Sequence, residues 1–199
     1  GRVSVKRVGS AERATAETRI SVTVDVDGTG SSDIETGVGF FDHMLELLAR
    51  HACIDAAIRA EGDLHVDEHH TVEDVGLVLG SALSDALGER RGIRRYGFLL
   101  PMDEALARVA LDLGGRPFVV FEAEFVRDRV GELPTELVED FVRALAQTLG
   151  ANIHVKVEYG RNDHHKIEAI FKALGRALRA AVERDPRLED RIPSTKGVL

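Results

Sequence analysis

The sequence predicts an α+β fold of two pseudo-symmetric halves, each an antiparallel sheet with two helices packed on one face. Asp67–Asp74 reads Asp-Glu-His-His-Thr-Val-Glu-Asp, and Asn162–Ala169 returns as Asn-Asp-His-His-Lys-Ile-Glu-Ala, a shift of 95 residues (164 − 69). The apolar positions of the helical pattern after each stretch repeat at the same shift. Strand-like and helical patterns precede both stretches, and a sheet with helices on one face is the stable arrangement of those elements.

The first half begins with two expected strands, Val3 to Val8 and Glu12 to Val26, in which β-favouring residues alternate with polar ones. A turn at Asp27-Gly28-Thr29-Gly30 ends the second strand, and residues 31–39 are expected to form a loop. From Val38 to about Arg50 the apolar residues recur at helical spacing. This part therefore predicts two strands followed by one helix.

The histidine-containing stretch of the first half lies between a strand and a second helix. The strand is expected at Ile54 to Ala60, followed by a loop from Glu61 to Val66. The helix is expected from Glu68 to about Leu87, and Gly88 can end it.

The second half repeats this order of elements. Strands are expected at Ala105 to Leu113 and Pro117 to Phe125, around a turn at Gly114-Gly115. The remaining elements are a helix opened by Pro134 and Thr135, a strand at Asn152 to Glu158, a closing helix with Ile167, Ile170, Leu174, Ala177, Leu178 and Ala181, and an irregular tail from Asp185 to Leu199. We divide the chain into a first repeat (1–92), a second repeat (93–187) and a C-terminal tail (188–199).

Composition excludes several classes of partner. The 199 residues carry a formal net charge of −8, whereas nucleic acid or an anionic membrane would favour a basic face. Cys53 is the single cysteine, so no internal disulfide is possible. No run is apolar enough to span a membrane and no signal-type segment is present, so a cytoplasmic protein that binds a small molecule is expected.

The paired histidines predict two metal sites, because imidazole and carboxylate are ligands of divalent transition metals. Residues four apart share one face of a helix, so each pair sends one histidine toward its glutamate and turns the other aside. The two histidines of a pair should therefore serve different ions. One predicted site contains His43, His70, His164 and Glu168, and its pseudo-mate contains His69, Glu73, His165 and Asp140. If these residues cannot meet within one chain, the ions would bridge subunits and drive assembly.

A simpler interpretation of each histidine pair is a solvated helix start capped by Asp67 or Asn162. His65 in a loop and His154 on a strand are expected to be solvated. His51, eight positions after His43, is retained as a weak ligand-contact candidate.

Basic and hydroxyl groups outside the two histidine-containing stretches could converge on a phosphate, although scattered surface charge is the simpler interpretation of any one of them. Glu17, taken alone, is an ordinary surface carboxylate at the start of a strand. The candidates for an anionic substrate are Arg95, Arg116, Lys172, Ser194, Thr195 and Lys196.

Short motifs from about Arg13 to the C-terminus carry a resemblance to a known family. They are Arg13-x-Thr-x-Glu-Thr18, Phe41-Asp-His-Met-Leu45, the two histidine-containing stretches, Met102-Asp-Glu-Ala105, Gly115-Arg-Pro117, Phe171-Lys172 and Pro193-Ser-Thr-Lys-Gly197. On these motifs the chain resembles the imidazoleglycerol-phosphate dehydratases, lyases of histidine biosynthesis.

The resemblance implies a ribosomal S5 domain 2-like duplication, two manganese ions (Mn2+) per active site and a homo-oligomer of 24 subunits assembled from trimers through metal. The implied reaction removes water from D-erythro-imidazoleglycerol 3-phosphate to give imidazole acetol phosphate. The substrate imidazole would be held as imidazolate between the two ions, with a diazafulvene-like intermediate. By this resemblance, Glu17 corresponds to an acid/base residue of the family. The ligands of one metal correspond to His43, His70, His164 and Glu168, and the residues that contact the phosphate correspond to Arg95, Arg116, Lys172, Ser194 and Lys196.

The chain departs from the family pattern at Asp140, where histidine is expected in many relatives. Either Asp140 is a ligand of a more oxygen-rich second site, or it is a spectator and water fills the position. Two other functions remain open from the residues alone. One is a different dinuclear metalloenzyme that hydrolyses a phosphorylated substrate, and the other is a non-catalytic metal-binding shell protein.

Overall fold

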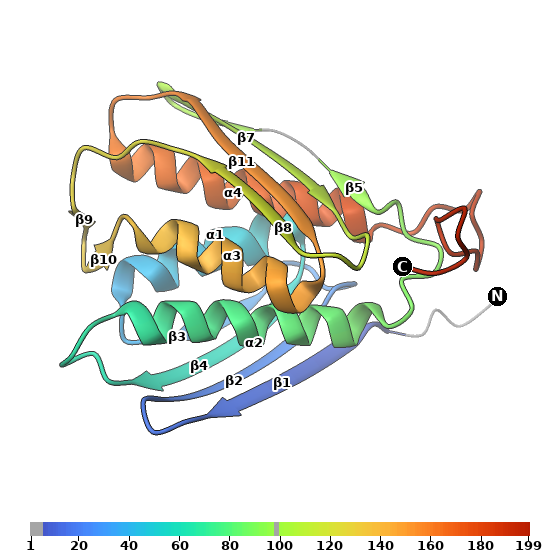
Figure 1. Cartoon of the computed structure of the whole chain (residues 1–199), viewed down its shortest axis with the longest axis horizontal. Coiled ribbons are helices and arrows are strands. Elements are labelled where there is room, and N and C mark those ends of the chain that lie inside the picture. The colour runs from blue at the N-terminus through green and yellow to red at the C-terminus, as the bar shows by residue number, and fades with distance from the viewer. Residues whose placement is uncertain (1–5, 98–99) are drawn as a thin grey trace.

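The computed structural model describes residues 6–97 and 100–199, and it places four helices between two sheets (Figure 1). The start of the first expected strand, Val3 to Val5, lies outside the described residues. The helices are α1 (Gly39–Ala52), α2 (His69–Leu87), α3 (Leu137–Leu149) and α4 (Asp163–Val182). The strands are β1 (Val8–Ala14), β2 (Thr18–Asp25), β3 (Ser32–Glu35), β4 (Asp55–Gly62), β5 (Tyr96–Gly97), β6 (Leu100–Met102), β7 (Ala105–Asp112), β8 (Phe118–Glu122), β9 (Arg129–Val130), β10 (Leu133–Pro134) and β11 (Asn152–Tyr159).

The two main sheets have matching topology, which confirms the duplicated α+β fold. Their strand orders are β1-β2-β4-β3 and β5-β7-β11-β8, with β6 also paired to β7. Most strand pairs are antiparallel, but β3 runs parallel to β4 and β8 runs parallel to β11. In each half a helix lies between the two parallel strands in sequence, and such a crossover returns the chain in the same direction.

One expectation about the segment after a long strand was wrong. The segment expected as a loop at residues 31–39 contains β3, which pairs through Ser32–Glu35 with β4. The error has a physical cause: β4, the partner of β3, follows only after a helix, and local patterns carry no information about such a pairing. The two strands expected around Gly114-Gly115 are present as β7 and β8, and β11 lies between them in the sheet.

The first hairpin is also displaced from its expected position. The break expected between Val8 and Glu12 lies inside β1, and the turn occurs at residues 15–17. There the Thr15 hydroxyl accepts hydrogen bonds from the amides of Glu17 and Thr18, both at 3.1 Å. Gly9 sits in the strand because a Cβ at this position would lie 2.1 Å from the Ala82 carbonyl oxygen of α2. The glycine marks a close approach of strand and helix rather than a turn.

The helices pack across the two halves rather than within each half. α1 packs on α4 and α2 packs on α3, while α2 covers β1 and β2 and α4 covers β7. Phe141 joins the halves at the centre, with its ring 5.5 Å from that of Phe41 and 5.3 Å from that of Phe171. All three phenylalanines are buried. One hydrophobic core therefore serves both repeats and brings α1 against α4.

The helix boundaries agree with those expected to within a few residues, since their apolar period is a local property. Gly88 ends α2 as expected, with its amide donating to the Ser84 carbonyl oxygen at 3.1 Å. Within the described ranges, no helix combines the length and the apolar character needed to cross a membrane.

Candidate active site

Both histidine pairs lie in the first turn of a helix. The Asn162 side-chain oxygen accepts hydrogen bonds from the amides of His164 (2.9 Å) and His165 (3.4 Å) at the start of α4. The Asp67 carboxylate accepts a hydrogen bond from the amide of His69 at 2.8 Å, but the N-cap of α2 is Glu68, whose side chain makes no capping hydrogen bond. The expected cap is therefore present at Asn162 and not at Asp67.

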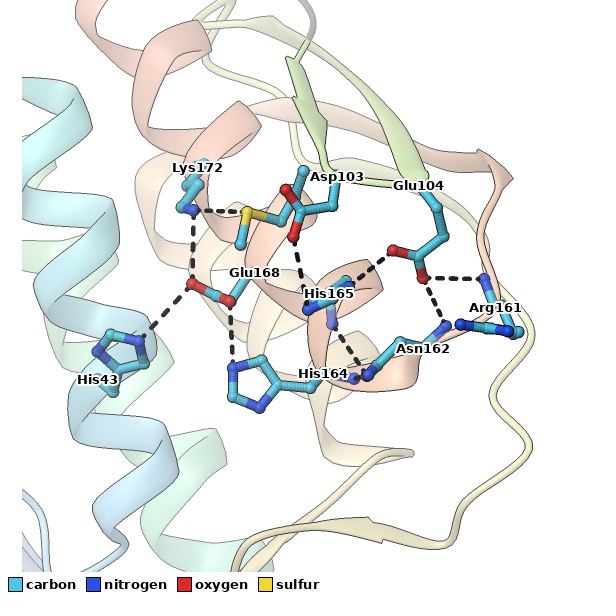
Figure 2. A network of polar contacts seen from close by, with 10 residues as sticks. His43, Asp103, Glu104, Arg161, Asn162, His164, His165, Glu168 and Lys172 are labelled. Carbon is cyan, nitrogen blue, oxygen red and sulfur yellow. Dashed lines mark hydrogen bonds and ion pairs between the residues drawn. The ribbon is translucent and has the colours of Figure 1, made fainter.

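One cluster with the geometry of a metal site joins α1 to α4. Glu168 presents one carboxylate oxygen to His164 Nε2 at 3.1 Å and the other to His43 Nε2 at 3.7 Å. Figure 2 shows Glu168 between these two imidazoles, with Lys172 approaching one of the same oxygens, at 3.4 Å. The Glu168 side chain is 9% exposed, whereas both imidazoles are partly open to solvent.

The donor set of this cluster fits a divalent cation. Ligand atoms about 2.1 Å from one ion and at right angles lie about 3 Å apart, which is close to the separations seen here. Two imidazole nitrogens and a carboxylate are also a common ligand set of divalent first-row transition metals. His43, His164 and Glu168 form the single group of three such residues found in the part of the chain that the structure describes.

The other half contains the corresponding pair on α2. His69 Nε2 lies 3.2 Å from Glu73 Oε2, one helical turn away. The shared face predicted for His69 and Glu73, and for His164 and Glu168, is thus observed. No third histidine, cysteine or carboxylate among residues 6–97 and 100–199 completes the α2 pair.

The remaining histidine of each pair points elsewhere. His70 Nδ1 lies 2.9 Å from Asp63 Oδ2, and its Nε2 lies 3.6 Å from Glu17 Oε2. The Asp63 hydrogen bond is the main cause that raises the pKa of His70. Within one chain, His70 therefore does not join the His43 cluster, and its ligand role remains a prediction.

His165 has equivalent surroundings in the second half. Its Nδ1 lies 2.7 Å from Glu104 Oε2 and its Nε2 lies 3.9 Å from Asp103 Oδ2. The hydrogen bond from His165, followed by that from the Asn162 amide, lowers the pKa of Glu104 to about 2. Asp140, in the first turn of α3, forms no hydrogen bond or ion pair with any described residue. Neither His165 nor Asp140 joins His69 and Glu73 within one chain.

Glu17 is held in place by the turn that precedes β2. Thr18 donates a hydrogen bond of 2.6 Å to the buried carboxylate of Asp74, and the Asp63 amide donates to the Glu17 carbonyl oxygen at 3.1 Å. Arg13 also lies 3.4 Å from Asp74. The Glu17 side chain, 54% exposed, is thereby aimed at His70.

The sequence patterns assigned no role to Asp63, Asp74 or Glu104. The one available signal for Glu104 was its place in Met102-Asp-Glu-Ala105, a motif shared with the family. Asp63 belonged to a segment expected to be a loop, with nothing local to connect it to His70.

A groove of about 800 Å³ brings together most of the predicted phosphate contacts. It is lined by Arg95, Arg116, Ser194, Thr195 and Lys196, together with Gly114, Gly115 and other tail residues. Arg95 binds the Asp112 carboxylate and donates a 3.0 Å hydrogen bond to the Pro193 carbonyl oxygen. These contacts fold the tail onto the second sheet, and the Asp112 hydrogen bond raises the pKa of Arg95.

Two predicted substrate contacts lie away from this groove. Lys172 is beside Glu168, and the pKa of His51 is lowered by burial and then by the charges of Lys172 and Arg176. The Arg95 amide donates to the Ala181 carbonyl oxygen near the end of α4, whereas His164 lies near its start. Seventeen residues (181 − 164) separate these positions, or about 25 Å of helix. Within one chain, the cluster lies near the start of α4 and the groove lies near its end.

The fold and the site define a class: duplicated α+β proteins in which two helix starts carry paired histidines, one of which belongs to a histidine–carboxylate cluster with metal-ligand geometry. A family model for imidazoleglycerol-phosphate dehydratase matches residues 36–178. The chain belongs to this family, whose members are lyases.

Relatives and solved structures agree with this assignment. The imidazoleglycerol-phosphate dehydratase of Cereibacter sphaeroides (strain KD131) is 60% identical over 194 residues, which are 97% of this chain and 100% of the relative. The histidine biosynthesis bifunctional protein HisB of Spirosoma linguale is 54% identical over 97% of this chain and 50% of its own length. The crystal structure of imidazoleglycerol-phosphate dehydratase from Staphylococcus aureus matches with a TM-score of 0.81 and 38% identity, covering 89% of this chain and 99% of that one.

Proposed function

We propose that this chain dehydrates D-erythro-imidazoleglycerol 3-phosphate to imidazole acetol phosphate in histidine biosynthesis, with two manganese ions in each active site. Membership of the family supports the reaction. The convergence of His43, His164 and Glu168 is the single observation that supports the metal.

The proposed ions account for a chemical difficulty of the reaction. The proton that leaves carbon is not next to a carbonyl group, so its electrons need another acceptor. When bound, the two ions would hold the imidazole ring of the substrate as its anion and make that ring the electron acceptor. One ion would be held by His43, His164 and Glu168 with His70, and the other by His69 and Glu73 with His165 and Asp140.

The remaining steps belong to side chains of this protein. We assign proton transfer to Glu17, because its exposed carboxylate faces His70 Nε2 at 3.6 Å and its turn is anchored through Asp74. The groove around Arg95 and Arg116 would bind the phosphate, since guanidinium groups bind phosphate oxygens in pairs. Lys172 would add positive charge beside Glu168, 3.4 Å away. His51 would be a neutral substrate contact, because burial and the charges of Lys172 and Arg176 lower its pKa.

The separation of cluster and groove supports an active site shared between subunits. A substrate with a short carbon chain between ring and phosphate does not span about 25 Å, the length of α4 between the two sites. His70 and His165 likewise face away from the clusters they are proposed to complete. We therefore propose a homo-oligomer in which metal ions join neighbouring chains. The family resemblance implies 24 subunits built from trimers, and we expect the assembly to be cytoplasmic.

The test is an assay of the purified manganese form on imidazoleglycerol phosphate, with Glu17→Gln as the comparison. We expect a ketone product that depends on manganese and is lost in Glu17→Gln. Release of inorganic phosphate instead would support a hydrolase. A particle that binds manganese with neither activity would support a shell protein.

A further inference from the structure

We propose that Glu104 is a positioning residue that takes the Nδ1 hydrogen bond of His165 and so leaves Nε2 of this imidazole free to bind an ion. The inference rests on the proposed function, because it assigns a role to a residue beside a predicted ligand. It concerns a carboxylate that neither the sequence patterns nor the family resemblance assigned.

The hydrogen bond itself determines the tautomer. Glu104 Oε2 lies 2.7 Å from His165 Nδ1, and an ionised carboxylate can only accept a hydrogen bond. The ring proton of a neutral His165 must therefore be on Nδ1, and the lone pair is on Nε2. Metal-bound histidines commonly have such a carboxylate partner on the other ring nitrogen, which fixes the orientation of the ring.

The Glu104 carboxylate is anchored on its other side. Its Oε1 accepts hydrogen bonds from the backbone amides of Asn162 (2.8 Å) and Arg161 (3.3 Å). Figure 2 shows the carboxylate between these amides and the His165 ring. Glu104 lies in the tight turn between β6 and β7, where Asp103 has a positive φ of 46°. The β6–β7 turn and the start of α4 are thereby locked together, and the imidazole has a fixed direction.

The first half contains the same arrangement, built from a different element. Asp63, in the loop between β4 and α2, binds His70 Nδ1 at 2.9 Å. A second carboxylate then faces Nε2 of each ring: Glu17 at 3.6 Å from His70, and Asp103 at 3.9 Å from His165. A chance surface contact would not recur at equivalent histidines through unrelated segments. The repetition indicates that both rings are held so that Nε2 is presented for binding.

The decisive experiment replaces Glu104 with glutamine and with alanine in the full chain. In Glu104→Gln the side-chain oxygen can still accept from Asn162 and Arg161, but the amide NH2 group faces His165 Nδ1. The NH2 group can only donate, so it forces the ring proton onto Nε2 and blocks the proposed ligand atom. Glu104→Ala removes the anchor but leaves the ring free to choose its tautomer.

Manganese binding to metal-free protein is measured by calorimetry, and the unfolding temperature of the metal-free protein is measured alongside. We expect Glu104→Gln to weaken one class of manganese site by about 10–100-fold while keeping an unfolding temperature near that of wild type. Glu104→Ala should unfold at a lower temperature yet bind manganese more tightly than Glu104→Gln. The two variants would then rank in opposite orders for unfolding temperature and for manganese affinity. A residue that only stabilises the fold would give the same order for both.

Glu122→Gln is the matched control, because the Glu122 carboxylate pairs with Lys156 on the second sheet and with none of the paired histidines of α2 and α4. The inference is overturned if wild type binds two ions per chain and Glu104→Gln binds both as tightly. It is also overturned if affinity follows the unfolding temperature through the two variants. Failure of the wild-type protein to bind manganese at all would instead overturn the proposed function.

Discussion

Nε2 of His43 lies 3.7 Å from Oε1 of Glu168, and this contact joins the α1 helix of the first half to the α4 helix of the second. The two residues are 125 positions apart in the chain (168 − 43). The packing of α1 on α4 around the shared core brings them together.

Replacement of Glu168 by glutamine should weaken one of the two proposed manganese sites, because the amide lacks the charge that offsets the cation. We expect at least a tenfold loss of affinity, measured by titration calorimetry. Glu35→Gln, at an exposed position of β3, is the control and should bind both ions. Unchanged stoichiometry and affinity in Glu168→Gln would show that this cluster does not hold metal.

Arg116→Ala should impair substrate binding through the phosphate. A charge-assisted hydrogen bond contributes about 1.5–3 kcal/mol, so KM should rise by about 10–100-fold with a smaller change in kcat. Arg108→Ala, which removes a guanidinium from the outer face of the second sheet, should leave KM unchanged. A normal KM in Arg116→Ala would remove this residue from the site.

Asp74→Ala should reduce both stability and activity. The buried Thr18 hydroxyl donates a hydrogen bond of 2.6 Å to the Asp74 carboxylate. The alanine removes this acceptor, and a buried hydroxyl that loses its partner costs about 1–3 kcal/mol. The turn that carries Glu17 should also loosen, so that kcat falls even where the protein is fully folded. Urea unfolding and steady-state kinetics measure the two effects. Asp33→Ala, which breaks an exposed ion pair with Arg59, should cost less than about 1 kcal/mol.

Asp55 should contribute to unfolding at acid pH. The amides of Thr29 and Ser31 donate hydrogen bonds to its carboxylate and lower its pKa below the ordinary value of 3.8. Because the folded-state pKa is depressed, this stabilisation is present above 3.8 and is lost as the pH falls toward the folded-state value. The free energy of unfolding of wild type should therefore fall more steeply below pH 3.8 than that of Asp55→Asn. Equal slopes in chemical denaturation at several pH values would contradict this assignment.

Local sequence was sufficient to predict the duplication, the helices and the direction in which the histidines point from each helix. These properties follow from local geometry, since residues four apart on a helix share a face whatever packs against them. His69 with Glu73, and His164 with Glu168, could thus be paired from their helical spacing alone. The family could also be recognised, because its motifs are short continuous stretches.

How these pieces meet depends on the tertiary structure. Contacts between distant segments place β3 parallel to β4 and β8 parallel to β11. Such contacts also bring Asp63 to His70 and Glu104 to His165. The packing of α1 on α4 likewise set which histidine reaches Glu168. Such contacts arise from burying one core shared by both halves, and that burial is a property of the whole chain rather than of any stretch within it.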